Sequence, residues 1–257
     1  MLGCIMRETA LLKRIAQGYR EALGENLAGL YLHGSLAFGC FHWETGDIDL
    51  IAMARDKLSP VEKRRLLSFL LDMRPQCPPK GIEMSVVLFE HCRHFSYPTP
   101  YELHFSQAWA ETAEKEPLLL MGDEAKTDHD LAAHFVMLRK AGIVLCGPPI
   151  EDAFAIVPRR SFVDSIRRDM ANAPEDALSN PVYVTLNLCR TLAFLTEGLL
   201  LSKEEGGRWM ISHTSFEWQR LIYAVLECYR TGEAYALQPD MARDFALLMR
   251  DRMKTLF

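Results

Sequence analysis

The hydrophobic positions of the first ninety residues follow two different periods, which predicts alternating helices and strands. Apolar residues recur at helical spacing between residues 5 and 24. Short apolar runs then predict three strands, within "GLYLHGS" at 29–35, "DIDLIAMA" at 47–54 and "IEMSVVLFE" at 82–90. Before the third strand, Ser59, Pro60 and Glu62 form a capping-box pattern, which predicts a helix over 59–73. This order of elements indicates an α/β fold with a mixed sheet.

The pattern becomes almost entirely helical in the second half of the chain. The segment "DLAAHFVMLRKAG" predicts a helix that ends at Gly142, and "IVLCGPPI" predicts a last extended piece. Later helices are predicted at 160–171, 181–197, 216–231 and 240–255. We therefore expect an α/β domain over 1–157 and an all-α helical bundle domain over 158–257.

Composition and charge narrow the classes of function. The chain has 257 residues, 49% of them hydrophobic, a formal net charge of -5 and a pI near 5.9. A chain of this size can bury a sizeable core. The acidic balance argues against a protein that binds nucleic acid through its phosphates, because such proteins carry a basic face. It fits an enzyme that acts on a small, cationic acceptor.

Cysteine usage and the N-terminal segment indicate a cytoplasmic protein. The seven cysteines include no Cys-x-x-Cys spacing and their number is odd, so a disulfide framework or a structural zinc site is not expected. The start "MLGCIMRETALLKR" meets charge too early for a signal peptide. No apolar stretch is long enough to span a membrane, and no membrane partner is expected.

Three carboxylates lie on strands that are otherwise apolar. Side chains alternate along a strand, so Asp47 and Asp49 point to the same face, roughly 7 Å apart. Glu83 lies on the following predicted strand and can join them if the two strands are neighbours. Clustered carboxylates repel one another and need shifted pKa values or bound cations. One or two magnesium ions, which prefer oxygen ligands and share them with substrate phosphates, would satisfy the cluster.

A Gly-Ser turn precedes the carboxylates. Gly34 and Ser35 end the first predicted strand, where free backbone N–H groups favour an anion. Together with the metal-holding carboxylates, this turn would bind a nucleoside triphosphate. The alternative is a capped helix and a polar strand edge without a ligand.

The predicted helix over 181–197 carries a polar stripe on an apolar background. Tyr183, Asn187 and Arg190 are spaced by four and three residues and share one helix face. A buried arginine needs an anionic partner. A triphosphate would provide one, because a guanidinium pairs with phosphate through two hydrogen bonds. The alternative is an ion pair with an acidic residue of the core.

The motifs in these segments resemble a known superfamily. "HGSLAFGCFHWETGDIDL" resembles the Gly-Ser and Asp-x-Asp signature of the DNA polymerase β-like nucleotidyltransferases. "YVTLNLCRTLAFLTEG" and "SKEEGGRWM" are similar to the aminoglycoside adenylyltransferases of the streptomycin and spectinomycin type. The resemblance spans nearly the whole chain. It implies an N-terminal nucleotidyltransferase domain and a C-terminal helical domain that closes the active-site cleft.

The resemblance also implies a reaction and its cofactors. AMP would pass from Mg-ATP to a hydroxyl of an aminoglycoside, with two Mg²⁺ ions and with ATP as co-substrate, in an antibiotic-resistance enzyme. Asp47, Asp49 and Glu83 would hold the metal, and Glu83 would also be the general base. The nucleotide would be bound by Gly34, Ser35, Asp130, Arg190, Lys203 and Tyr229.

Without the resemblance, several of these side chains have ordinary interpretations. Lys203, beside two glutamates, would be a solvated surface residue, and Tyr229 a half-buried tyrosine near a helix end. The segment "HCRH" at 91–94 predicts a polar loop, and the acidic stretch 111–130 predicts a solvated loop.

The residues expected to contact the acceptor depart in part from the family pattern. We expect Glu83, Trp109, Asp176, Asn180 and Tyr183 to bind it. Trp109 would stack on a sugar ring, although a core position is the alternative. Asp176 keeps the acidic character that pairs with drug ammonium groups in the family. Asn180 does not, and Tyr183 stands where a histidine can occur.

Two further functions remain open at this point. The same chemistry would serve a non-antibiotic acceptor, such as a protein hydroxyl or a metabolite. A nucleotide-binding regulatory module without catalysis is the other, and the intact Asp47, Asp49 and Glu83 argue against it.

Overall fold

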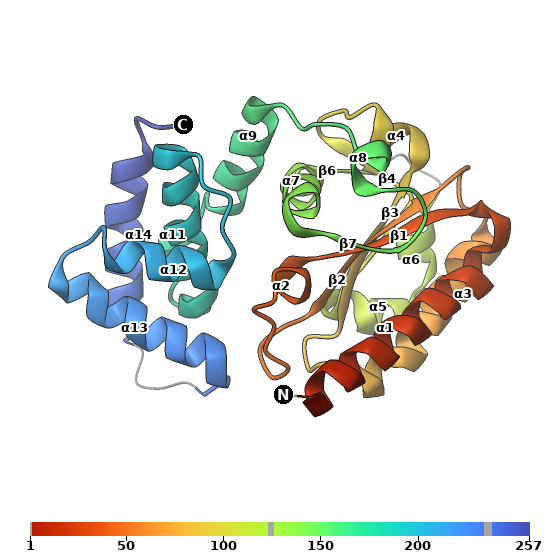
Figure 1. Ribbon diagram of the computed structural model, residues 1–257, viewed down its shortest axis with the longest axis horizontal. Coiled ribbons are helices and arrows are strands. Elements are labelled where there is room, and N and C mark those ends of the chain that lie inside the picture. The colour runs from red at the N-terminus through yellow and green to blue at the C-terminus, as the bar shows by residue number, and fades with distance from the viewer. Residues whose placement is uncertain (1, 123–125, 234–237) are drawn as a thin grey trace. The chain divides into compact units, whose positions relative to one another are not determined.

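The computed structural model describes residues 2–122, 126–233 and 238–257. The chain separates into two compact units, Met1–Val157 and Pro158–Phe257 (Figure 1). The first is built on a mixed sheet with helices on its faces, and the second is helical in the part that is described. The predicted fold class is confirmed.

The main sheet of the first unit runs in the order β5-β3-β2-β1-β7. Strands β2 and β3 are parallel, and the other neighbouring pairs are antiparallel. The strands are β1 Leu27–His33, β2 Ile48–Ala54, β3 Ile82–Leu88, β5 Leu103–Phe105 and β7 Ile143–Cys146. The predicted neighbouring position of the two carboxylate strands is thus confirmed.

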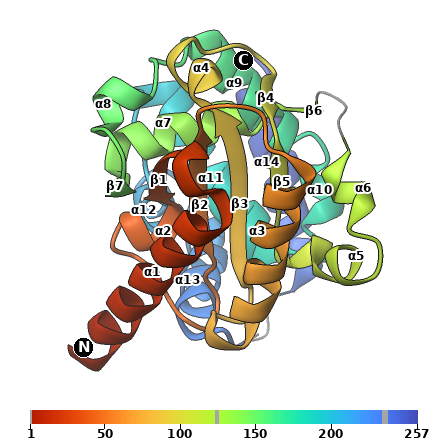
Figure 2. The same ribbon diagram turned by 90° about the vertical axis from the view of Figure 1, so that its right-hand side faces the viewer.

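Two long helices cover one face of this sheet. Figure 2 shows α1 (Leu2–Leu23) and α3 (Pro60–Met73) side by side in front of the strands. Their apolar faces pack on the inward residues of β1, β2 and β3, among them Leu32, Leu50 and Met84, which are almost fully buried. The predicted capping box of α3 is present, with Ser59 and Glu62 bonded to each other's backbone N–H groups. The opposite face carries Asp49 and Glu83 at one end of the strands and buried apolar residues such as Ile51 further along.

Short elements complete the first unit. Helix α7 (Leu131–Ala141) lies on the opposite side of the sheet from α1 (Figure 1). The others are α2 Gly34–Ala37, α4 Phe89–Arg93, α5 Ala110–Lys115, α6 Leu118–Met121, α8 Ile150–Ala153 and a β4 Thr99–Tyr101/β6 Lys126–Asp128 pair.

Two sequence predictions are wrong in this region. Residues 91–93 of this segment belong to helix α4 rather than to a loop, and Cys92 turns inward and is fully buried. The described part of 111–130 contains α5, α6 and β6 rather than a loop, because Ala113, Leu120 and Met121 are buried in the core.

The second unit is a bundle around α11. Helix α11 (Pro181–Glu197) packs against α12 (Lys203–Ile211), α13 (Phe216–Thr231) and α14 (Pro239–Met253). Helices α9 (Arg159–Asp169) and α10 (Ala173–Asp176) precede it. Ten residues of α11 are buried, which explains its nearly continuous apolar sequence. Among the described residues, no helix is long and apolar enough to cross a membrane.

Candidate active site

Three carboxylates meet at the N-terminal ends of two parallel strands. Asp47 precedes β2, Asp49 is the second residue of β2, and Glu83 is the second residue of β3. The register pairs Asp49 with Glu83 directly. One oxygen from each of the three carboxylates lies within 4.8 Å of the other two. All three side chains are half-buried, so the cluster can hold a cation and remain open to a ligand.

The donor set fits magnesium better than a softer metal. It consists of carboxylate oxygens, the ligands that Mg²⁺ and Ca²⁺ prefer, and no cysteine belongs to the described cluster. Neither Asp47 nor Glu83 forms an ion pair with a basic residue in the described part of the chain. A bound cation would compensate their mutual repulsion.

Gly34 is the residue that brings the first strand against this cluster. Its φ of +66° lies in the left-handed region, which glycine adopts without strain. A Cβ at this position would lie 1.6 Å from Asp49 Oδ2. The backbone of the turn and the Asp49 carboxylate are therefore in direct contact, and a side chain at position 34 would separate them.

The adjacent Ser35 offers an unused hydroxyl. Its Oγ is buried and has no hydrogen-bond partner within the described residues. Its carbonyl oxygen accepts the backbone N–H of Cys40 at 3.0 Å, which closes the turn. A buried hydroxyl without a partner is costly, and a bound phosphate oxygen would satisfy it.

Histidines that the sequence analysis did not single out surround the carboxylates. His33 pairs with Asp49 across β1 and β2, and its ring lies 4.9 Å from that of His134 on α7. Burial, with a smaller contribution from His134, holds the pKa of His33 well below its usual value. His33 is therefore neutral near pH 7. No local sequence pattern marks this group, because the strands and α7 come together only in the fold.

A second histidine lies beside the expected base. Ser85, two residues after Glu83 on the same strand face, forms a 3.0 Å hydrogen bond with His104 Nδ1. Burial lowers the pKa of His104, and the negative charges of Glu83 and Asp128 offset this effect only in part. His104 is thus a neutral imidazole whose electrostatic environment includes Glu83.

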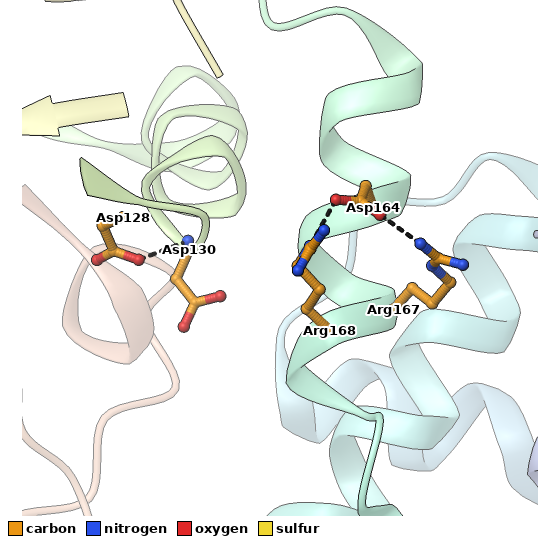
Figure 3. Close-up of polar contacts among 5 residues, drawn as sticks. All are labelled: Asp128, Asp130, Asp164, Arg167 and Arg168. Carbon is orange, nitrogen blue, oxygen red and sulfur yellow. Dashed lines mark hydrogen bonds and ion pairs between the residues drawn. The ribbon is translucent and has the colours of Figure 1, made fainter. Parts of the chain in front are cut away.

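Asp130, a predicted nucleotide-binding residue, lies at the start of α7. Its side chain is exposed, and its backbone N–H donates to Asp128 Oδ1 at 2.8 Å (Figure 3). The bond fixes the turn between β6 and α7. Trp109, expected at the acceptor, ends the turn Gln107–Trp109 and is 45% exposed, so it is not the core tryptophan of the alternative interpretation.

The second unit gathers two of the predicted phosphate-binding cations. Arg190 is half-buried on α11, and Lys203 begins α12. The two helices approach closely at Gly206, where a Cβ would lie 2.7 Å from Arg190 Cβ. This close packing places the start of α12 beside the polar stripe of α11. The Lys203 ammonium lies 4.6 Å from the centre of the Tyr183 ring, so Lys203 is not the solvated residue of the alternative interpretation.

Arg190 also differs from the arginines of α9. Asp164 is paired with both Arg167 and Arg168, each at 2.6 Å (Figure 3). For Arg190, the described residues provide no comparable ion pair. The core ion pair that was the alternative interpretation is therefore not found in the described part of the chain.

Asp169 completes the polar stripe and was missed by the sequence analysis. It is the last residue of α9, and its carboxylate accepts the Tyr183 hydroxyl at 3.1 Å and the Asn187 amide at 3.1 Å. Burial and the neighbouring carboxylate raise the pKa of Tyr183, so the phenol remains a donor. Asp169 carries no motif, and the preceding Asp164-Arg168 spacing suggests only a surface helix.

The remaining predicted residues lie elsewhere on the helical unit. Asp176 ends α10 and Asn180 is at the N-cap position of α11. Both side chains are exposed, and the Asn180 backbone N–H donates to the Asp176 carbonyl at 2.8 Å. Tyr229 is half-buried on α13 against the apolar core of the bundle. Asp176 and Asn180 are thus available to a ligand, whereas Tyr183 is engaged by its neighbours.

Comparisons with known proteins agree with the resemblance inferred from the motifs. Residues 152–252 match the family described as the aminoglycoside adenylyltransferase C-terminal domain. Proteins named aminoglycoside (3'') (9) adenylyltransferase from Klebsiella pneumoniae and Escherichia coli are each 23% identical, over 93% of this chain and 95% of their own lengths.

A solved structure shares the fold. The spectinomycin adenyltransferase AAD(9) from Enterococcus faecialis, solved with ATP and spectinomycin, superposes with a TM-score of 0.81 at 15% identity. The alignment covers 95% of this chain and 99% of that one. The predicted resemblance to the aminoglycoside adenylyltransferases is confirmed, and so is the prediction of an enzyme of the nucleotidyltransferase type.

Proposed function

We propose that this chain, a relative of the aminoglycoside adenylyltransferases, transfers AMP from Mg-ATP to a hydroxyl group of an aminoglycoside such as streptomycin or spectinomycin. The observation that supports the proposal most strongly is the contact of the Gly34 turn with a three-carboxylate cluster. A phosphate-binding turn and a magnesium-binding cluster in direct contact are what a nucleoside triphosphate with its metal requires.

The candidate site residues of the first unit would each have a role in this reaction. Asp47, Asp49 and Glu83 would hold one or two Mg²⁺ ions, which neutralise phosphate charge and stabilise the attacking and leaving oxygens. The backbone N–H groups at Gly34 and the Ser35 hydroxyl would orient the triphosphate. Glu83 would take the proton of the acceptor hydroxyl as its oxygen bonds to the α-phosphorus. The bond between the α-phosphorus and its bridging oxygen then breaks, and pyrophosphate leaves.

Residues of the second unit would complete the nucleotide and acceptor contacts. We propose Arg190 and Lys203 as phosphate ligands, because the described residues offer Arg190 no ion pair. A guanidinium binds phosphate through two parallel hydrogen bonds. Exposed Asp176 would pair with an acceptor ammonium, and the net charge of -5 favours a cationic acceptor generally.

Pyrophosphate release across nucleotides and acceptors tests the proposal. We expect release with ATP and at least one of streptomycin and spectinomycin, dependent on Mg²⁺. Asp49→Asn should abolish both turnover and Mg²⁺-dependent ATP binding, because it removes a charge from the cluster. Normal turnover of this variant would refute the metal assignment.

The same assay separates the two alternatives. Release with protein or metabolite hydroxyls, but with no aminoglycoside, would show that the acceptor is not an aminoglycoside. The proposed transfer of AMP from Mg-ATP would still hold. ATP binding without release for any acceptor would identify a regulatory module. Absence of both ATP binding and release would refute the proposal altogether.

A further inference from the structure

The helical unit contains a chain of side-chain contacts that ends at Lys203, a predicted phosphate ligand. Asp169 fixes Tyr183 through its phenol, and the Asn187 amide holds the same carboxylate. The face of the Tyr183 ring in turn carries the Lys203 ammonium. Four side chains from α9, α11 and α12 are thus linked in one order: Asn187, Asp169, Tyr183, Lys203.

The first part of this chain is rigid. Asn187 is only 1% exposed, so its amide has little freedom to leave Asp169. The Tyr183 hydroxyl is 3.1 and 3.3 Å from the two oxygens of Asp169, and the donated hydrogen bond fixes the direction of the ring. The raised pKa of Tyr183 keeps this proton in place at neutral pH. The ring is therefore held at both ends, by its backbone on α11 and by its hydroxyl.

The second part of the chain restrains a flexible side chain. Lysine has a four-carbon stem and loses considerable rotamer freedom when its ammonium is fixed. A ring face attracts the ammonium through its charge and so adds a restraint on its position. Close packing at Gly206 also anchors the helix from which Lys203 extends.

We propose that Asp169 and Tyr183 are positioning residues that hold the Lys203 ammonium ready for the nucleotide phosphates. The proposal rests on the proposed role of Lys203 in binding the triphosphate. It assigns Tyr183 to the nucleotide side of the reaction, in place of the acceptor contact expected from its sequence position. The hydroxyl of Tyr183 is already used by Asp169, and its ring face by Lys203.

Steady-state kinetics give the first test. Tyr183→Leu removes the ring, and we expect kcat/KM for ATP to fall roughly two- to fivefold, the range of one exposed cation–π contact. The KM for the acceptor should stay unchanged. Asp169→Asn, which weakens the hold on the ring, should change the same parameter in the same direction. In a Lys203→Met background, Tyr183→Leu should have no further effect on ATP.

Exposed Tyr223 on α13 provides a matched control. Tyr223→Leu makes the same chemical change away from the chain of contacts and should leave both KM values unaltered. Thermal melting of every variant identifies a simple loss of folding. A rise in acceptor KM with unchanged ATP kinetics in Tyr183→Leu would overturn the proposal and restore the acceptor role.

A readout without nucleotide separates this proposal from the proposed function. Reductive ¹³C-methylation preserves the lysine charge, and Lys203→Arg assigns the Lys203 methyl resonance. Over the Tyr183 ring, that resonance should shift upfield in the parent and return to the position of exposed lysines in Tyr183→Leu. An unshifted parent resonance would refute the positioning, even if ATP binds. A shifted resonance in a protein that does not bind ATP would support the positioning and refute the proposed function.

Discussion

At the scale of single residues, the candidate site combines charge with close backbone contact. Glu83 lies beside two aspartates and shares its strand face with Ser85, which holds His104. Gly34 lies directly against Asp49, and no side chain would fit at position 34. Substitutions of Glu83 and Gly34 can therefore be designed so that their effects on ATP binding and on catalysis are measured separately.

Glu83→Gln distinguishes the proposed role of Glu83 as general base from a role as metal ligand only. The amide keeps the size and one oxygen but cannot accept the proton of the acceptor. We expect Mg-ATP binding close to that of the parent and transfer slower by roughly 10²–10⁴-fold, the usual contribution of a general base. Calorimetry of ATP binding and single-turnover rates measure the two effects. If binding is lost together with the rate, Glu83 acts chiefly as a ligand, and an unchanged rate would place the base elsewhere.

Gly34→Ala tests the contact between the turn and the cluster. The left-handed backbone conformation would cost alanine about 1–2 kcal/mol of folding free energy, and its Cβ would also displace the Asp49 carboxylate. We expect lower stability and loss of Mg²⁺-dependent ATP binding. Gly24→Ala is the control, since its φ of +53° carries similar strain while a Cβ there meets nothing within 4 Å. Equal loss of ATP binding in both variants would contradict a local effect at Asp49.

At the scale of elements, the packing of α12 on α11 decides where Lys203 lies. Two consecutive glycines, Gly206 and Gly207, face α11 and α13 with no space for side chains. A Cβ at Gly206 meets backbone atoms of Arg190 at 2.8 Å, whereas one at Gly207 meets the ends of the Leu186 and Leu226 side chains. Only the second kind of contact can be relieved by a rotamer change.

Gly206→Ala should therefore be destabilising, although alanine is favoured over glycine in helices by about 1 kcal/mol. Its methyl group would push α12 away from Arg190, and we expect a lower melting temperature and weaker ATP binding. Gly207→Ala should lower the melting temperature less. Differential scanning calorimetry and ATP titration of the two variants measure this. Stabilisation by Gly206→Ala would show that α12 can move without cost.

The sequence predicted the long elements and the residues that lie within motifs. Strands β1, β2 and β3 and helices α3, α7 and α11 were predicted because their apolar periods and caps are local signals. Helix α12 was not predicted, because Gly206 and Gly207 lower helix propensity and the packing that stabilises it comes from α11. Asp169 and His33 were missed for a related reason. Their roles depend on partners far away in sequence, and no local pattern marks them.

At the scale of the whole molecule, each unit has its own hydrophobic core. One cluster of buried residues runs from Leu11 to Met121 and the other from Met170 to Met253. Between them, Ile156 is 78% exposed although it is apolar. We propose a domain boundary at residues 157 and 158, because two separate cores are the mark of two domains.

Limited proteolysis tests this boundary. Arg159 and Arg160 are exposed at the first turn of α9, where a helix frays most easily. Mild trypsin treatment should first give two fragments, cut after one of these arginines, that persist during further digestion. Replacing both by glutamine should delay this cut. Early cleavage inside either core would contradict two independently folded units.

The register of β2 and β3 has a practical consequence for handling the protein. Asp49 faces Glu83 in the same pairing that sets Leu50 against Met84 in the core. A slip of one residue would turn Glu83 to the opposite face and carry apolar side chains out of the interior. Correct burial and the correct arrangement of the carboxylate cluster thus depend on one alignment of two strands. For a preparation refolded from denaturant, we therefore expect the fraction of molecules that bind Mg²⁺ to equal the fraction whose sheet has reassembled correctly. Measurements of total helix content would not detect this difference.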